Sequence, residues 1–155
     1  MKLISFVMVA ALAIPCYALQ GSKAEVFPSK DIASQLSALV EKAKASGSSG
    51  ATLGDYKSHA IKLSVRTGSG GAEVHGHYDD IFVVTQGQAT LVTGGTVLDA
   101  KTNADGETMG SKIQNGTSQT IVKGDVVHIP AGTPHQLLLH GETFSAIIIK
   151  VKEAQ

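Results

Sequence analysis

Two glycine-bounded stretches in the middle of the chain carry most of its histidines and most strongly limit how it can fold. The first begins at Gly71, continues through Ala72-Glu73-Val74-His75-Gly76-His77-Tyr78-Asp79-Asp80 and ends at Gly87. The second runs from Gly124 through Pro130 and Gly132 to His135. Both stretches join turn residues to short runs that favour β-strands. They indicate a β-structure in which strand ends present histidines and a carboxylate.

Further strands are predicted within and around these stretches. The segment 60–66 alternates apolar and polar residues, which is typical of a half-buried strand. Further short strands are expected at 81–84, 89–92, 118–122, 126–129, 135–139 and 144–151, and a surface loop is expected at 101–110. Short strands separated by glycine turns, with no helix between them, predict an all-β antiparallel sandwich or barrel.

The N-terminal third differs from the rest of the chain. Residues 1–18 have the pattern of a signal peptide, with Lys2, an apolar run too short to span a bilayer, and small residues before Ala18. A lipid anchor at Cys16 is a weaker alternative, because Pro15 precedes it. Residues 19–50 are predicted to form a linker and one amphipathic helix, and residues 51–155 the barrel domain. We therefore expect an exported protein, periplasmic or secreted, with no stable membrane insertion after cleavage.

Composition excludes some classes of partner. The chain of 155 residues has 13 basic and 13 acidic residues, and Arg66 is the only arginine. A balanced charge gives no basic face for nucleic acid. The single cysteine, Cys16, would leave with the signal peptide, so any metal in the mature chain must be bound by histidine and carboxylate.

The histidine spacing predicts a metal site. His75 and His77 are two residues apart, so on a strand both side chains would point to the same face. Asp80 would add an oxygen ligand, either directly or through water, and Asp79 is the alternative carboxylate. His135 would complete the set. Three imidazoles and one carboxylate suit Fe, Mn, Ni, Cu or Zn, and ligand type alone does not choose among these metals.

The joint pattern resembles the cupin superfamily. That family's second motif matches at Gly124, Pro130, Gly132 and His135, with Leu139 where asparagine is usual. Its first motif matches at His75, His77 and Gly87, with Asp80 in place of glutamate and with only two residues between His77 and Asp80 instead of three or four. The resemblance covers about residues 60–151. It implies a double-stranded β-helix, or jelly-roll barrel, with a metal in its mouth.

The resemblance also limits the functions to consider. We expect a metal-dependent, dioxygenase-like oxidoreductase acting on a small organic molecule. The alternatives are a non-catalytic binding or sensing protein and a metal-dependent isomerase or lyase. His128, pointing either into or out of the barrel, and Tyr78 are the candidates for a catalytic base. The aliphatic residues around the ligands favour an apolar or aromatic substrate. The resemblance to cupins, which often form dimers, implies a homodimer.

Overall fold

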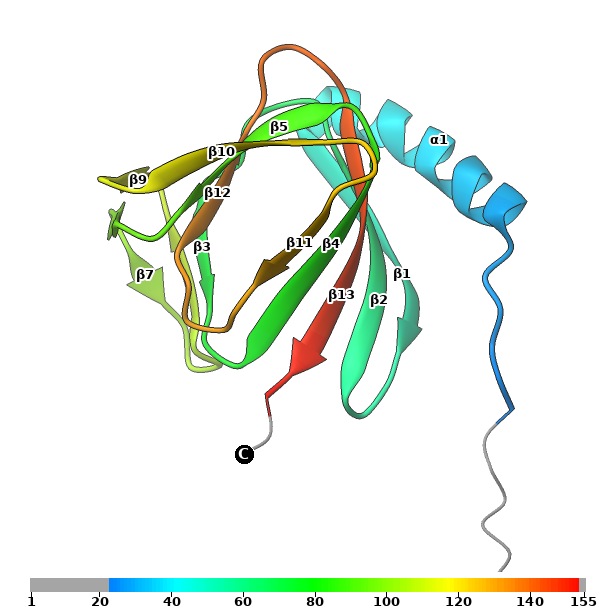
Figure 1. Cartoon of the computed structure of the whole chain (residues 1–155), viewed down its shortest axis with the longest axis horizontal. Helices are drawn as coiled ribbons and strands as arrows, with labels where there is room; N and C mark the ends of the chain where they lie inside the picture. The colour runs from blue at the N-terminus through cyan, green and yellow to red at the C-terminus, as the bar shows by residue number, and fades with distance from the viewer. Residues whose placement is uncertain (1–22, 154–155) are drawn as a thin grey trace, which may run out of the picture.

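The structure, a computed structural model, describes residues 23–153 and consists of a two-sheet β-barrel with one helix packed on its outside (Figure 1). The signal peptide predicted at residues 1–18 lies outside the described residues. The elements, in chain order, are α1 (Ser29–Ser46), β1 (Ser48–Asp55), β2 (His59–Arg66), β3 (Ala72–His75), β4 (Tyr78–Gln86), β5 (Gln88–Thr93), β6 (Thr96–Leu98), β7 (Lys101–Thr102), β8 (Glu107–Gly110), β9 (Lys112–Gln114), β10 (Thr117–Val122), β11 (Val126–Ile129), β12 (His135–Leu138) and β13 (Phe144–Lys152).

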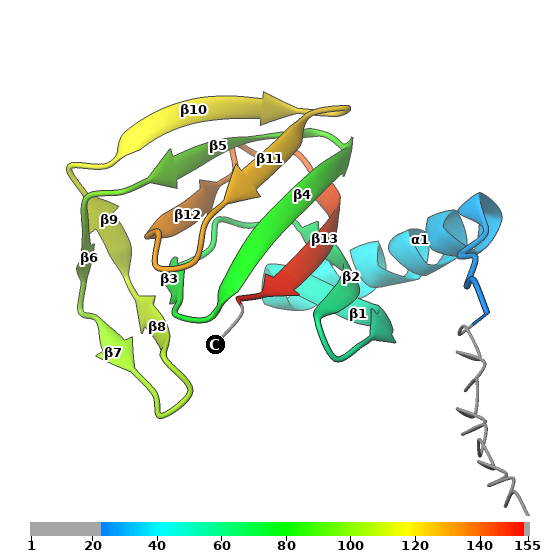
Figure 2. The ribbon, with the colours of Figure 1, turned by 60° about the horizontal axis from the view of Figure 1, so that its bottom comes forward.

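The strands form two main sheets that face each other. One sheet has the order β1-β2-β13-β4-β11, and the other has the order β10-β5-β12-β3-β8-β7. A short ribbon, β6-β9, extends one side, and the second view shows the two sheets enclosing a common interior (Figure 2). Neighbouring strands pair antiparallel, with crossovers between distant parts of the chain. This arrangement confirms the predicted all-β jelly-roll.

Side-chain alternation divides the barrel interior into an apolar end and a polar end. On β4, the inward-facing residues are Asp80, Phe82 and Val84, and these lie opposite Lys150, Ile148 and Ala146 on β13. Phe82 and Val84 belong to the buried core, together with Leu91, Leu137 and Phe144. Asp80 and Lys150 continue the same two inward rows past that core. The register of one strand pair therefore places charged residues at one end of the barrel.

The helix α1 packs on the outer face of the first sheet. Leu39 and Ala43 are buried against Leu63 and Val65 of β2. Ile32, Leu36 and Val40 pack against the same cluster. The helix ends at Ser46, and the following Gly47 caps it with a left-handed φ of 82°. Pro28 occupies the N-cap position, and no side chain caps the helix there. The helix serves as packing for the barrel, as its pattern predicted.

Two segments predicted as irregular are strands. Residues 48–50 fall within the segment predicted as linker and helix, but Ser48 pairs with Arg66 and β1 begins there. The segment 101–110, expected to be a surface loop, contains β7 and β8, which extend the second sheet beyond β3. Both segments are rich in glycine and polar residues because each belongs to an edge region with a solvent-facing side. Within residues 23–153, the only helix falls short of what is needed to cross a bilayer.

Candidate metal centre

Glu73 and His75 come from the same face of β3. They are two residues apart on the strand, so both side chains point into the barrel. The strand ends at His75, and Gly76 and His77 form the turn into β4. Because the strand's alternation stops there, the inward-facing pair is Glu73 and His75. The histidine spacing had suggested His75 and His77, two residues later.

His135 reaches the same point from β12. The corner made by residues 130–134 leads into this strand, and the Gly132 amide donates a 2.8 Å hydrogen bond to the His75 carbonyl. His135 then pairs with Glu73 across the β12–β3 ladder. The His135 Nδ1 donates to the Thr133 carbonyl at 3.0 Å, which leaves the Nε2 lone pair facing the interior.

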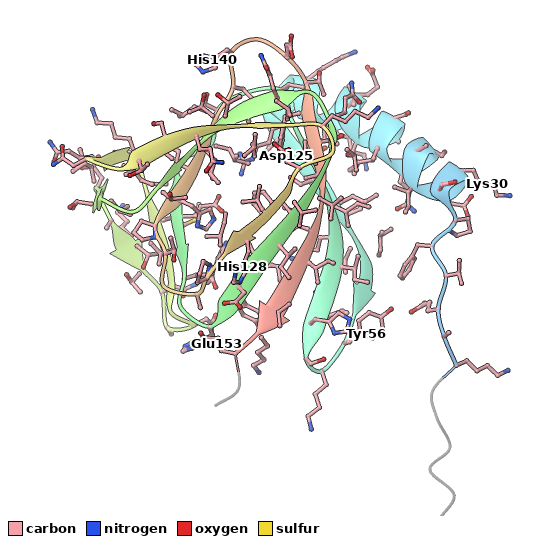
Figure 3. The ribbon with its side chains drawn as sticks, in the orientation of Figure 1. Lys30, Tyr56, Asp125, His128, His140 and Glu153 are labelled. Atoms are coloured by element: carbon pink, nitrogen blue, oxygen red, sulfur yellow. The ribbon has the colours of Figure 1, made fainter. Side chains whose placement is uncertain are left out.

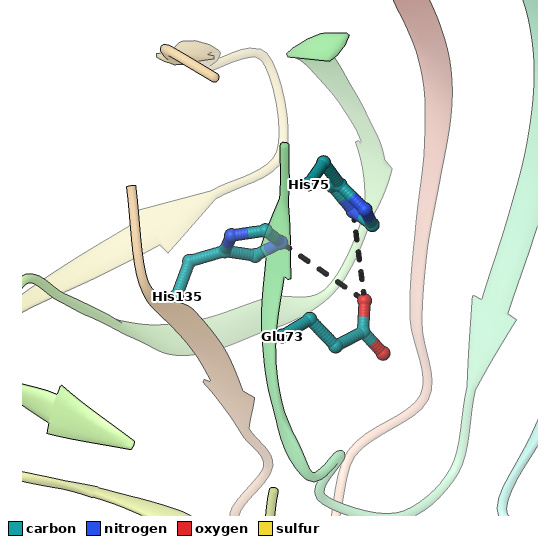
Figure 4. A group of neighbouring side chains, drawn as sticks. All are labelled: Glu73, His75 and His135. Atoms are coloured by element: carbon teal, nitrogen blue, oxygen red, sulfur yellow. Dashed lines mark ion pairs between the residues drawn. The ribbon is translucent and has the colours of Figure 1, made fainter. Parts of the chain in front are cut away.

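The three side chains form a group that could hold a metal ion (Figure 4). One ligand atom from each of Glu73, His75 and His135 lies within 4.8 Å of the others. The Glu73 Oε2 lies 3.8 Å from the His75 Nε2 and 4.0 Å from the His135 Nε2. Two imidazole nitrogens and one carboxylate oxygen are donors that divalent transition metals bind well. The donor set therefore fits the metal that the sequence predicted, and it does not select one metal.

Carboxylates hold both ring nitrogens of His75. Its Nδ1 contacts the Glu107 carboxylate, and its Nε2 lies 3.3 Å from the Asp80 Oδ2. Burial alone would lower the pKa of His75, but the hydrogen bonds to Asp80 and Glu107 outweigh it and raise that pKa above 6.5. A carboxylate on the far nitrogen of a ligand histidine fixes the ring and makes it a stronger donor. Glu107 is placed to do this for His75.

The other histidine behaves in the opposite way. Burial lowers the pKa of His135 below 6.5, and the hydrogen bond to the Thr133 carbonyl offsets only part of that effect. A neutral imidazole is the form that binds a metal. His135 is therefore neutral near pH 7 and can bind a metal through Nε2, while its Nδ1 is bonded to a backbone carbonyl instead of a carboxylate.

Of the two neighbouring carboxylates, Asp80 faces the interior and Asp79 does not. The Lys150 Nζ donates a 2.7 Å hydrogen bond to the Asp80 Oδ1. Asp79 instead accepts a 2.8 Å hydrogen bond from the Ala131 amide and contacts His128. Burial would raise the pKa of Asp80, but its bonds to His75 and Lys150 lower it below 3.8, so this carboxylate is ionised.

Three residues singled out from the sequence lie away from the group. His77 is exposed in the β3–β4 turn, where its ring approaches Gly106, and it is not brought to Glu73, His75 and His135. His128 is exposed on β11, because the inward positions of that strand are taken by Val127 and Ile129 (Figure 3). Tyr78 lies beyond Asp80 at the rim, with Lys150 Nζ 5.9 Å from its ring centre. None of these placements supports a role at the metal group.

A cavity of about 450 Å³ surrounds the group. Its lining is mixed in character, with apolar residues toward the barrel core and charged residues around the ligands. The residues that line it include Leu63, Phe82, Leu137, Phe144 and Ile148, the polar Ser64 and Gln136, the acidic Glu73, Asp80 and Glu107, and the basic Lys62, Arg66 and Lys150. The apolar surroundings expected from the sequence describe only part of this cavity.

Sequence reasoning missed Glu73 and Glu107. A signal for Glu73 was present, since four residues separate His75 from Asp80 and six separate Asp80 from Gly87, which is the cupin spacing. With Glu73-x-His75 in place of His75-x-His77, the short interval before Asp80 disappears. Glu107 carried no such signal, because it pairs with His75 only through the β3–β8 ladder.

Comparison with known proteins supports the fold. Neither a family model nor a curated protein sequence matches the chain. Solved structures do match. The DMSP lyase DddQ from Ruegeria pomeroyi gives a TM-score of 0.51 at 16% identity, over 70% of this chain and 48% of that one. A protein with a double-stranded β-helix domain from Klebsiella pneumoniae gives 0.50 at 16% identity, over 68% and 76%.

A third structure, the cupin domain of Cnp3 from Schizosaccharomyces pombe, gives 0.51 at 14% identity over 68% of this chain and 65% of that one. The chain thus spans about half the length of DddQ. At such identities the likeness shows the fold. The chain has the cupin fold, a double-stranded β-helix, as its two motifs predicted.

Proposed function

We propose that this protein is a metal-dependent cupin that acts on a small organic molecule bound beside the metal, with Glu73, His75 and His135 as the metal ligands. The observation that carries the proposal is the convergence of these three side chains at the polar end of the barrel. Two histidines and one carboxylate, with further positions left open, form the ligand set of non-haem iron oxygenases. This composition favours oxygenase-type chemistry over the other reactions considered.

Glu73, His75 and His135 would hold an iron ion, which would supply Lewis-acid and redox chemistry to the bound substrate. The chain's own residues would prepare the site for it. The Thr133 carbonyl accepts a hydrogen bond from the His135 Nδ1, and the Glu107 carboxylate accepts one from the His75 Nδ1. The Nε2 of His135 thereby faces the Glu73 carboxylate, and the Nε2 of His75 lies near both the Asp80 and the Glu73 carboxylates.

Asp80 and Lys150 would act at the edge of the group. Lys150 holds the Oδ1 of Asp80, which leaves the Oδ2 turned toward His75. Asp80 would orient the His75 ring, and it is the nearest further carboxylate for a metal or its water. The apolar side chains of Phe82, Phe144 and Ile148 would exclude water from the hydrocarbon part of a substrate.

Two rival functions remain in view. A non-catalytic binding protein would use the same cavity without open metal positions. An isomerase or lyase needs a base near the substrate, and the candidates Tyr78 and His128 lie at the rim and on the outside. DddQ is named a lyase, yet its likeness to this chain is one of fold. An oxygenase-type function is therefore better supported than a non-catalytic binding function or an isomerase or lyase function.

The test uses cobalt(II), whose visible absorption reports its coordination. The protein would be purified without chelator, freed of metal and titrated with cobalt under anaerobic conditions. We expect stoichiometric binding and a spectrum that changes when azide is added, because open positions admit a further ligand. A tetrahedral spectrum insensitive to azide would favour the non-catalytic binder, and failure to bind cobalt would contradict the proposal.

Export and self-association are part of the proposal as expectations carried from the sequence. The substrate would then be met outside the cytoplasm. Fractionation of cells for the mature chain and light scattering on the purified protein would test these two points separately.

A further inference from the structure

A second cavity, of about 380 Å³, adjoins the metal cavity at the rim of the barrel. Lys62 and Lys150 line both cavities. The second one is otherwise surrounded by Lys57, Lys152, His59 and the aromatic rings of Tyr56 and Tyr78, with Asp55 as its acidic member. The two cavities therefore share two lysines, in a chain that has equal numbers of basic and acidic residues overall.

The balance of charge differs between the two cavities. Three basic and three acidic side chains line the metal cavity, so their charges cancel until a divalent ion binds. Four lysines and one aspartate line the second cavity, and Lys150 is the one of these lysines that is paired with Asp80. A positive, partly enclosed space of this kind attracts anions more strongly than an isolated surface lysine does.

Lys62 is the residue at the junction. It lies on the inward row of β2, directly opposite Ile148 of β13, and it lines both cavities. Lys150 is bonded to Asp80, and Arg66 lies 3.6 Å from Glu73. Within the described part of the chain, Lys62 forms no ion pair. Its ammonium group is therefore available to a ligand.

We propose that the ligand of the metal cavity is a small organic acid with a second acidic group, which Lys62 binds at the junction while Lys57 and Lys152 add to the field. The inference rests on the proposed function, since it places the rest of that ligand beside Glu73, His75 and His135. The apolar surface of Phe82 and Ile148, which line the metal cavity together with Lys62, suits a short hydrocarbon chain. A lysine ammonium recognises an anion as a point charge without demanding a planar partner.

The experiment measures the contribution of the second acidic group. Succinate, glutarate and adipate would each be compared with the corresponding monoamide by calorimetric titration. The comparison would be made on zinc-loaded and on chelator-treated protein, at constant ionic strength. The variants are Lys62→Gln and, as a matched control on an exposed strand, Lys112→Gln.

We expect at least one diacid to bind the wild-type protein about tenfold more tightly than its monoamide, a preference that Lys62→Gln abolishes and Lys112→Gln retains. The inference would be overturned if Lys62→Gln kept the preference for the diacid over its monoamide. It would also be overturned if none of the three diacids showed saturable binding. Zinc content, measured on the same samples, reports the proposed metal site independently. Loss of zinc binding would contradict the proposed function while the diacid comparison still decides the role of Lys62.

Discussion

Lys150 and Asp80 lie directly opposite each other on β13 and β4, and the Lys150 Nζ donates a 2.7 Å hydrogen bond to the Asp80 Oδ1. The side chains are only 17% and 5% exposed. Asp80 in turn approaches His75, so this pair connects the barrel's first sheet to the metal group on the second. The polar end of the barrel is therefore a network in which each charge depends on its neighbour.

We expect Lys150→Met to destabilise the protein by about 3 kcal/mol, because it leaves the Asp80 carboxylate buried without its lysine. Urea unfolding in the presence of a chelator measures the change, with Lys112→Met as the exposed control. The double variant Lys150→Met/Asp80→Asn should recover part of the loss. A loss for Lys150→Met no larger than that of the control would show that the pair contributes little.

The pKa values of the two interior histidines, His75 and His135, should lie on opposite sides of the ordinary value. The pKa of His75 is raised above 6.5, so its contribution to stability is complete below that pH and is lost as the pH rises through the folded value. The pKa of His135 is lowered, so its contribution is present above 6.5 and is lost as the pH falls through the folded value. NMR titration of the imidazoles in metal-free protein measures both, and the reverse order would contradict the assigned contacts.

Glu107 should tune metal affinity through His75. We expect Glu107→Gln to weaken metal binding about tenfold or more, since the carboxylate orients the ring and strengthens it as a donor. The same variant should lower the pKa of His75 in metal-free protein, a change that a purely structural role would not produce. Asp105→Asn, on the exposed turn nearby, is the matched control. Unchanged affinity and an unchanged His75 pKa would remove Glu107 from the site.

The helix should contribute to stability by packing. Leu39 is 5% exposed against β2, and Leu39→Ala should cost about 3 kcal/mol through lost burial and the cavity left behind. Val26, which is 78% exposed, gives a matched control in Val26→Ala. Thermal or urea unfolding compares the two. Equal stabilities would mean that α1 is not part of the folded unit in solution.

The sequence predicted the fold because its signals were periodic and local. An apolar stripe identified α1, and alternation of apolar and polar residues identified β2, against which the helix packs. The stripe consists of Ile32, Leu36, Leu39, Val40 and Ala43. The glycine turns separated the remaining strands. Edge strands β1 and β7 were missed because polar, glycine-rich segments form strands only when a neighbouring strand supplies the hydrogen bonds.

The candidate site was predicted in part. His75, His135 and the inward-facing Asp80 come together, and Asp79 turns away to Ala131. The structure places His77 outside this group because β3 ends at His75, and spacing alone does not say where a strand ends. Gly76, a turn residue directly after His75, was the local sign that the alternation stopped. Lys150 and Glu107 depend on pairing between distant strands, which no local pattern reveals.

The most direct measurement is the metal content of a protein that begins at residue 19, after the predicted signal peptide, compared with its Glu73→Gln and His77→Gln variants. All three would be purified without chelator and analysed for iron, manganese, nickel, copper and zinc, with circular dichroism to confirm folding. We expect near-stoichiometric metal in the wild type and in His77→Gln, and little in Glu73→Gln. Metal lost from His77→Gln and retained in Glu73→Gln would contradict the ligand set and return the site to the register suggested by the histidine spacing.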